Sequence, residues 1–160
     1  MEKKVESISA IWLSKEKTTI EQCSKKVYDF LLLLRVYNND LFGHWYEKGN
    51  SKKEAINNQV DFNQDYFKRD LEKKWDKKFE DLGARISYWS GNKNDSESAQ
   101  INFNIGAYGD KSFNKNSCIL TLPENDKFFS SAKEIDDLIN LMKNYWKPNK
   151  MLINGIMYQI

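Results

Sequence analysis

The chain has 160 residues, a length that predicts a single domain over residues 1–160 with a hydrophobic core of its own. Its 25 basic and 23 acidic side chains nearly cancel, so no bulk positive charge draws it onto nucleic acid. The longest apolar run, residues 30–34, is far too short to cross a bilayer, and no hydrophobic signal core follows Met1. We therefore expect a cytoplasmic protein without a membrane segment.

The first part of the chain predicts a strand and a long helix. Segment 5–13 alternates apolar and polar residues, which predicts a strand with Ile8 on its buried face. Thr18 with Glu21 matches a capping box, so a helix is expected to begin there and to end near residue 38. Its core-facing residues recur at three- and four-residue spacing and are Ile20, Cys23, Val27, Phe30, Leu31 and Leu34.

Two further helices are expected before residue 83. Ser51 with Glu54 matches a second capping box and predicts a short helix that ends near residue 57. Asp61 with Gln64 matches a third, which opens a strongly charged helix that Gly83 would end as a C-cap. The apolar side of this helix would consist of Phe67, Leu71, Trp75, Phe79 and Leu82.

The remainder of the chain predicts mainly strands. Segments 84–89, 100–105 and 118–122 are joined by polar loops, a pattern typical of an antiparallel meander. Ser131 with Glu134 predicts the start of a last helix that stops before Pro148, and residues 151–160 predict a final strand. We expect an α+β fold, a largely antiparallel sheet of about five strands with helices packed on one side. The buried residues of the last helix would be Ile135, Leu138, Ile139, Met142 and Trp146.

The sequence contains no recognisable catalytic or metal-binding pattern. A Gly-x-Ser-x-Gly elbow, a His-Glu-x-x-His helix and a glycine-rich phosphate loop are all missing. The single histidine, His44, lies among aromatic residues, which favours a packed or capping role over that of a general base. Cys23 and Cys118 lie in apolar patterns and are expected to be reduced core thiols. We predict no enzyme activity, no cofactor and no metal site.

Segment 41–55 places large aromatic rings and two glycines between two helical patterns. A surface linker is usually rich in Ser, Gly or Pro and lacks such rings. Full burial of one large apolar side chain, such as Phe42, stabilises a fold by about 1.5–3 kcal/mol. We therefore expect a loop that is pinned to the core by Phe42 and Trp45, with a new helical turn starting at Ser51.

This aromatic segment resembles the Phe-x-x-Trp-x-x-x-Gly-x-Ser segment of the immunity protein 52 family. Trp89-Ser90-Gly91 is similar to the Trp-Asn-Gly of that family, and further similarities follow in the same order as far as Trp146. The resemblance extends over roughly residues 5–155. The matching positions are interpreted as packing and turn residues: Phe42, Trp45, Gly49, Ser51, Gly91, Gly106 and Pro123.

The resemblance implies an immunity protein of a bacterial polymorphic toxin system, encoded beside the toxin that it neutralises. From the family we expect a nuclease toxin of restriction-endonuclease-like fold as the partner. Because the net charge here is +2, steric capping of the toxin's active site with a local acidic patch is favoured over a generally acidic inhibitor. Two alternatives are a nucleic-acid-associated regulator, which salt-sensitive binding would reveal, and a small enzyme with a perturbed carboxylate or His44 in a deep pocket.

Partner contacts are expected in loops, because loops can vary to discriminate among toxins. Trp89 has two interpretations, since it lies on the polar side of its strand and is either an exposed anchor or packed under a helix. The candidate contacts come from the aromatic loop, a hairpin and a long loop, and are Tyr46, Glu47, Trp89, Asn92, Asp95, Glu97, Tyr108, Asp110 and Phe113.

Overall fold

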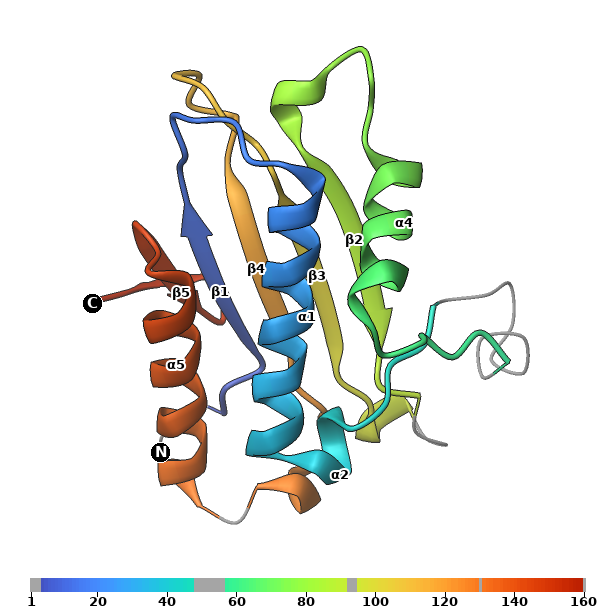
Figure 1. The fold of residues 1–160 in the computed structure, drawn as a ribbon. Coiled ribbons are helices and arrows are strands. Elements are labelled where there is room, and N and C mark those ends of the chain that lie inside the picture. Colours follow the sequence, from blue (N-terminus) through green and yellow to red (C-terminus); the bar gives the residue numbers. More distant parts are fainter. Residues whose placement is uncertain (1–3, 48–56, 92–94, 130, 160) are drawn as a thin grey trace.

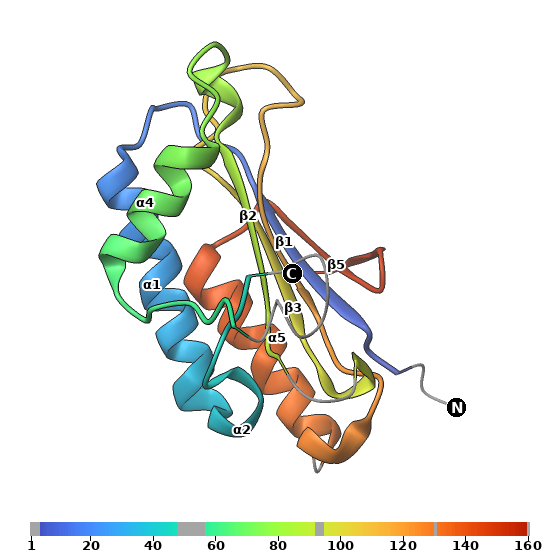
Figure 2. The same cartoon turned by 90° about the vertical axis from the view of Figure 1, so that its right-hand side faces the viewer.

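The computed structural model describes residues 4–47, 57–91, 95–129 and 131–159. Its centre is one antiparallel sheet of six strands in the order β2-β3-β4-β1-β5-β6. Helices α1, α4 and α5 lie side by side on one face of this sheet, as Figures 1 and 2 show. The strands are β1 Ser7–Trp12, β2 Ala84–Trp89, β3 Gln100–Ile105, β4 Asn116–Thr121, β5 Lys150–Ile153 and β6 Ile156–Tyr158. The helices are α1 Ile20–Tyr37, α2 Asn39–Phe42, α4 Gln64–Lys74 and α5 Ala132–Trp146, with 3₁₀ turns η1 Glu80–Leu82, η2 Asp95–Glu97 and η3 Asp126–Phe128.

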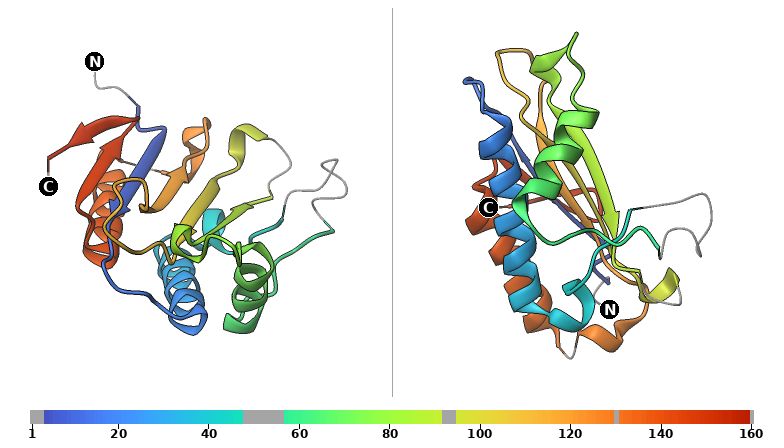
Figure 3. Two further views of the ribbon diagram at one scale, coloured as in Figure 1. Left: turned by 90° about the horizontal axis from the view of Figure 1, so that it is seen from above. Right: turned by 45° about the vertical axis from the view of Figure 1, so that its right-hand side comes forward.

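The predicted α+β class and the predicted meander β2-β3-β4 are confirmed. Alternation of side chains along each strand sends one set of residues toward the helices. One cross-strand row of this set consists of Ile86, Phe103, Cys118, Ala10 and Met151, all buried. The core therefore lies between the sheet and the helix layer, and no helix of the described residues covers the other face (Figure 3).

Helix α1 begins one residue later than predicted. Thr19 is the N-cap, accepts a hydrogen bond from the Gln22 amide, and completes the capping box with the Gln22 side chain. The predicted capping residue Thr18 is instead within 3.3 Å of the Cys23 sulfur. The Glu21 carboxylate, predicted to complete the cap, is instead paired with Lys68 of α4. Thr19 and Gln22 form the capping box in place of Thr18 and Glu21.

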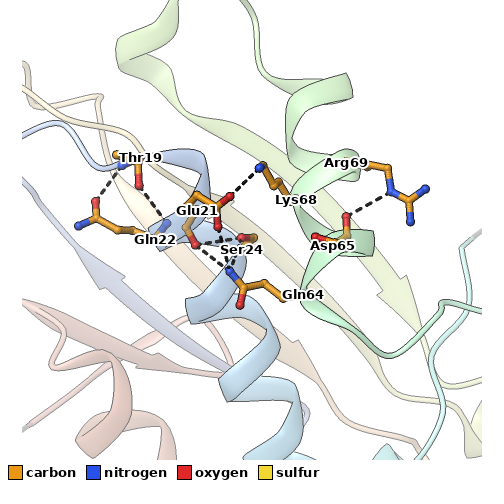
Figure 4. A network of polar contacts seen from close by, with 8 residues as sticks. All are labelled: Thr19, Glu21, Gln22, Ser24, Gln64, Asp65, Lys68 and Arg69. Carbon is orange, nitrogen blue, oxygen red and sulfur yellow. Dashed lines mark hydrogen bonds and ion pairs between the residues drawn. The ribbon is translucent and has the colours of Figure 1, made fainter.

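A polar network joins the start of α1 to α4 (Figure 4). The Lys68 ammonium lies 2.5 Å from the Glu21 carboxylate, and the Gln64 amide donates to the Glu21 main-chain oxygen and the Ser24 hydroxyl, each at 3.3 Å. The Glu21 side chain is 62 % exposed and that of Lys68 is 34 % exposed, so water weakens the ion pair and the network contributes orientation more than stability.

Helix α4 is shorter than predicted, and its expected apolar stripe is wrong beyond Trp75, which is partly buried against the core. The helix ends at Lys74, and Phe79 is 49 % exposed. An Asx turn, in which the Lys78 amide donates to the Asp76 side chain at 2.8 Å, offers the backbone an alternative to the helix. Gly83 caps the 3₁₀ turn η1 rather than α4, with a φ of 73°.

The chain's last predicted strand is in fact a hairpin. β5 and β6 pair through a turn at Asn154 and Gly155, whose φ angles of 54° and 76° suit the tight turns of hairpins. Helix α5 has the predicted span, and its predicted buried face is confirmed except that Ile135 is only partly buried. Its N-cap Ser131 makes no side-chain cap bond. The short helix predicted from Ser51 falls within residues 48–56, outside the described part of the chain.

Candidate partner-binding surfaces

The aromatic loop is pinned to the core by its rings, as expected. Phe42 and Trp45 are buried and stacked, with ring centroids 5.9 Å apart. Beyond them Tyr46 pairs with the end of β2: its amide donates to the Trp89 oxygen at 2.9 Å and its oxygen accepts from the Trp89 amide at 3.0 Å. Trp89 is only 9 % exposed and its ring centroid lies 6.1 Å from that of Tyr46, so it is not an exposed anchor, and within the described part of the chain Tyr46 packs against it.

Gly91 belongs to the same contact. Its φ is +74°, and a Cβ at this position would lie 2.2 Å from the Tyr46 ring. The predicted contact Tyr46 therefore acts first as the cover of Trp89 and Gly91. Among the described residues, the Tyr46 side chain packs against this end of the sheet and does not project freely as an anchor for a partner.

Glu47 joins a polar cluster between the loop and α4. Its carboxylate is 4.0 Å from the Lys74 ammonium, which also lies 3.1 Å from Asp70. Asp70 is buried and accepts a hydrogen bond of 2.6 Å from the Tyr88 hydroxyl. Burial, and then the Asp70 carboxylate, raises the pKa of Tyr88. The cluster locks α4 to β2, so Glu47 is at least partly structural.

Three of the sequence-predicted partner contacts belong to the hairpin between β2 and β3, and the structure describes the side chain of one of them, Glu97. Glu97 forms an ion pair of 3.0 Å with Lys127 of η3. Asp95 lies in η2, where only its main chain is described, and Asn92 lies outside the described residues. The 3₁₀ turn η2 and the end of β2, with which Tyr46 pairs, lie at the lower end of the sheet in Figure 1.

The long loop 106–115 lies at the opposite end of the sheet (Figure 1). Hydrogen bonds hold it to two neighbouring segments: the Tyr108 amide donates to the Asp81 oxygen at 3.0 Å, and the Gly109 amide to the Ser14 oxygen at 2.9 Å. Phe113 is 65 % exposed and Asp110 is exposed, so their side chains are open to a partner. The structure thus divides the sequence-predicted contacts between two ends and does not bring them together.

Two clefts flank the start of α1 at this upper end. One, of about 580 Å³, lies between α1 and the end of α5 and is lined by residues that include Trp12, Lys26 and Tyr145. The other, of about 690 Å³, lies between α1 and the end of α4, with Trp75 in its wall. Trp75 also packs over Gly106, whose φ is +88°, so that a Cβ there would lie 2.0 Å from the ring.

A third surface was not predicted from the sequence. Leu32, Leu33 and Val36 on α1 are 38 %, 41 % and 79 % exposed, on the side of the helix turned away from the sheet. The available signal was the apolar run 30–34, because an amphipathic helix needs only part of such a run for its buried stripe. We call Leu32, Leu33 and Val36 the α1 ridge.

The described residues offer little that resembles a catalytic centre. No group of three or more His, Cys, Asp or Glu side chains among them is placed to hold a metal ion. Of the two roles expected for His44, packed or capping, the packed one is wrong: the side chain is exposed, and its Nδ1 lies 3.1 Å from the Gln59 amide nitrogen. Cys23 and Cys118 are buried free thiols, as expected, and burial raises the pKa of both. In the described part of the chain, none of the helices combines the length and apolar character needed to span a membrane.

Comparison with protein families gives a match over most of the chain. The model of a family described as immunity protein 52 matches residues 7–158, from the first residue of β1 to the last residue of β6. A search of curated proteins found no match. The family match therefore covers the whole sheet and the helix layer, including both ends and the α1 ridge.

Proposed function

Because the chain belongs to the immunity protein 52 family, we propose that it binds a cognate toxin and neutralises it by capping the toxin's active site. The observation that carries this proposal is the extent of the match, which runs from β1 to β6 rather than over one motif. Immunity proteins of toxin systems generally act by binding and not by catalysis. We further propose that the toxin is a nuclease of restriction-endonuclease-like fold and that binding takes place in the cytoplasm.

Capping is a mechanism of surface complementarity. A nuclease cleft combines metal-binding carboxylates with basic contacts to phosphate, so an inhibitor can fill it sterically and offer carboxylates to its basic rim. The chain carries a net charge of +2, so only a local acidic patch can supply the second contribution. Of the sequence-predicted contacts, Asp110 and Phe113 have exposed side chains that could reach such a partner without rearrangement.

Co-expression tests this proposal. The product of the adjacent gene is induced in a bacterial host with this chain, with an empty vector, or with an unrelated protein of similar size. We expect growth arrest in the two controls, rescue by this chain, and co-purification of the two proteins in equal amounts. A neighbour that is harmless alone, or that kills equally in all three strains, would contradict the assignment for that pair.

The nucleic-acid alternative predicts a different result. A regulator that binds DNA or RNA through phosphate contacts would lose affinity steeply with rising salt, because binding releases counterions. Purified protein is therefore titrated into labelled duplex DNA and single-stranded RNA at several salt concentrations. We expect no saturable binding, and a steep salt-dependent isotherm would favour the alternative.

A further inference from the structure

The edge strand β6 leaves its outer side open. Ile156, Met157 and Tyr158 are 62 %, 65 % and 39 % exposed, and in the described part of the chain β6 pairs only with β5. The hairpin of these two strands forms one margin of the sheet, at the red end of the ribbon in Figure 3. An open strand edge presents unpaired amide and carbonyl groups, so the ligand that it fits is another extended strand.

The register of the hairpin shows which main-chain groups face outward. The Asn154 amide donates to the Ser7 oxygen of β1 at 3.0 Å, so the preceding residue, Ile153, directs its main chain to the other side, toward β6. Ile153 pairs there with Ile156. The next residue, Met157, therefore points its N–H and C=O away from the sheet, where no strand of the described residues pairs with them.

The side chains of β6 are apolar on both faces of the sheet. Tyr158 lies opposite Met151, which is buried between the sheet and the helices. Tyr158 and Ile156 therefore extend the core side of the sheet beyond the cover of the helix layer. Met157 lies opposite Leu152 on the other face.

Charge does not protect this edge. Edge strands are commonly kept apart by a charged side chain or a proline, and residues 151–159 contain neither. Lys150 begins β5, and the main chains of Lys4 and Glu6 bond to the Asn154 side chain at 2.8 Å and 2.6 Å. The bonds to Asn154 hold the hairpin turn against the start of β1, so the open edge is preformed. Two copies of segment 151–159 can meet without charge repulsion.

The opposite edge of the sheet is treated differently. Tyr46 pairs through its main chain with Trp89 of β2, and the same strand carries the exposed charge of Arg85. Both features discourage the addition of a further strand. Within the described residues the sheet therefore has one unprotected edge, so pairing through it joins two copies and then ends.

We propose that β6 pairs antiparallel with β6 of a second copy of this chain, which joins two six-stranded sheets across a two-fold axis. Complete overlap of the strands sets Met157 opposite Met157 of the second copy, and the two residues exchange both main-chain hydrogen bonds. Ile156 of each copy then faces Tyr158 of the other, and a β-branched residue opposite an aromatic ring is a favourable cross-strand pair. This self-complementarity favours a second copy over a strand of the toxin. The inference concerns the free chain and goes beyond the proposed function.

Sedimentation velocity of the purified full-length chain, over a concentration series extended into the millimolar range, tests for the dimer. Strands of three residues bury less than the roughly 1,600 Å² of a standard interface, so we expect a weak monomer–dimer equilibrium. Its dissociation constant should change little with added salt, because no ion pair takes part.

Met157→Pro removes an N–H that has no partner within one copy, so the circular dichroism spectrum and the melting curve should stay unchanged. The dissociation constant should rise at least about tenfold, because both intermolecular hydrogen bonds are lost. The control is Asn140→Lys at an exposed position of α5, which should leave the constant within about twofold of the wild-type value.

Cysteine cross-linking tests the register, and its result stands even if Met157→Pro fails to fold. Opposed Cα atoms of a hydrogen-bonded pair lie about 5.5 Å apart, within reach of a disulfide, whereas positions offset by two residues lie about 7–8 Å apart. With oxidised glutathione, Met157→Cys should therefore yield a covalent dimer and Ile156→Cys should not. The wild-type chain, whose two thiols are buried, gives the background.

Four results would overturn the proposal. They are a wild-type chain that stays monomeric at every concentration, an unchanged dissociation constant in Met157→Pro, species larger than a dimer, and cross-linking of Ile156→Cys in preference to Met157→Cys. A monomeric wild-type chain whose binding to the toxin of the adjacent gene is lost in Met157→Pro would assign the edge to a toxin strand instead.

Discussion

The buried contact between Tyr88 and Asp70 gives the sharpest stability prediction. The Tyr88 hydroxyl donates to the Asp70 carboxylate at 2.6 Å between β2 and α4, where Tyr88 is fully buried and Asp70 is 7 % exposed. Tyr88→Phe removes that donor and keeps the ring, whose centroid is 5.8 Å from that of Phe67. The substitution therefore opens no large cavity and isolates the hydrogen bond.

The magnitude follows from what Asp70 retains. The carboxylate keeps its ion pair of 3.1 Å with Lys74, so the variant does not leave an unpaired buried charge. A hydrogen bond to a charged group contributes about 1.5–3 kcal/mol to the free energy of unfolding. For a domain of this length each kcal/mol shifts the melting temperature by about 2–4 °C, so we expect a decrease of about 3–12 °C.

Urea and thermal denaturation, followed by circular dichroism, measure the loss. Tyr28→Phe is the matched control, because Tyr28 packs as a ring against Phe62 at the same helix layer and should change stability by no more than about 0.5 kcal/mol. A double-mutant cycle with Asp70→Ala should give a coupling energy of about 1 kcal/mol or more. Wild-type stability in Tyr88→Phe, or zero coupling, would refute the reasoning.

Three further predictions concern the same fold. Gly106→Ala should lower the free energy of unfolding by about 1–3 kcal/mol because of its φ of +88°, and by a further amount because the new Cβ clashes with Trp75. The control Gly155→Ala has a φ of +76° and open space around it, so it should show only the backbone contribution. Equal losses in urea melts would contradict the Trp75 contact. Cys23 and Cys118 are buried, so a thiol reagent should label both only after denaturation, and rapid labelling of the native protein would contradict their placement. Burial, and then the carboxylates of Glu134 and Asp137, raises the pKa of Tyr37 to about 12, compared with about 10 in an unfolded chain. The folded state therefore keeps the hydroxyl proton to a higher pH than the unfolded state does. The free energy of unfolding should fall as pH rises from 10 to 12. Tyr37→Phe should lessen that fall in alkaline urea titrations, and an identical pH profile would contradict it.

Some of the site's arrangement could have been derived before the structure. Consecutive loops of a meander emerge at alternate ends of the sheet, so hairpin 92–97 and loop 106–115 could not form one contiguous surface. The Asn154-Gly155 pair is likewise a recognisable hairpin turn, and it divides the expected last strand in two. In both cases the local patterns were correct, and the error was to treat each loop or strand independently of its neighbours.

The sequence by itself determined the alternation of β1 to β4, the buried stripe of α1, the family resemblance and the α+β class, because these depend on residue periodicity along one element. Only the tertiary structure decided that Trp89 is covered by Tyr46, that α4 ends at Lys74, and that Val36 faces solvent. A period identifies the two sides of a strand or helix, but the elements packed on each side decide which is buried. Leu32 and Leu33 remain 38 % and 41 % exposed and Val36 remains 79 % exposed, and these fractions depend on the elements that pack around α1.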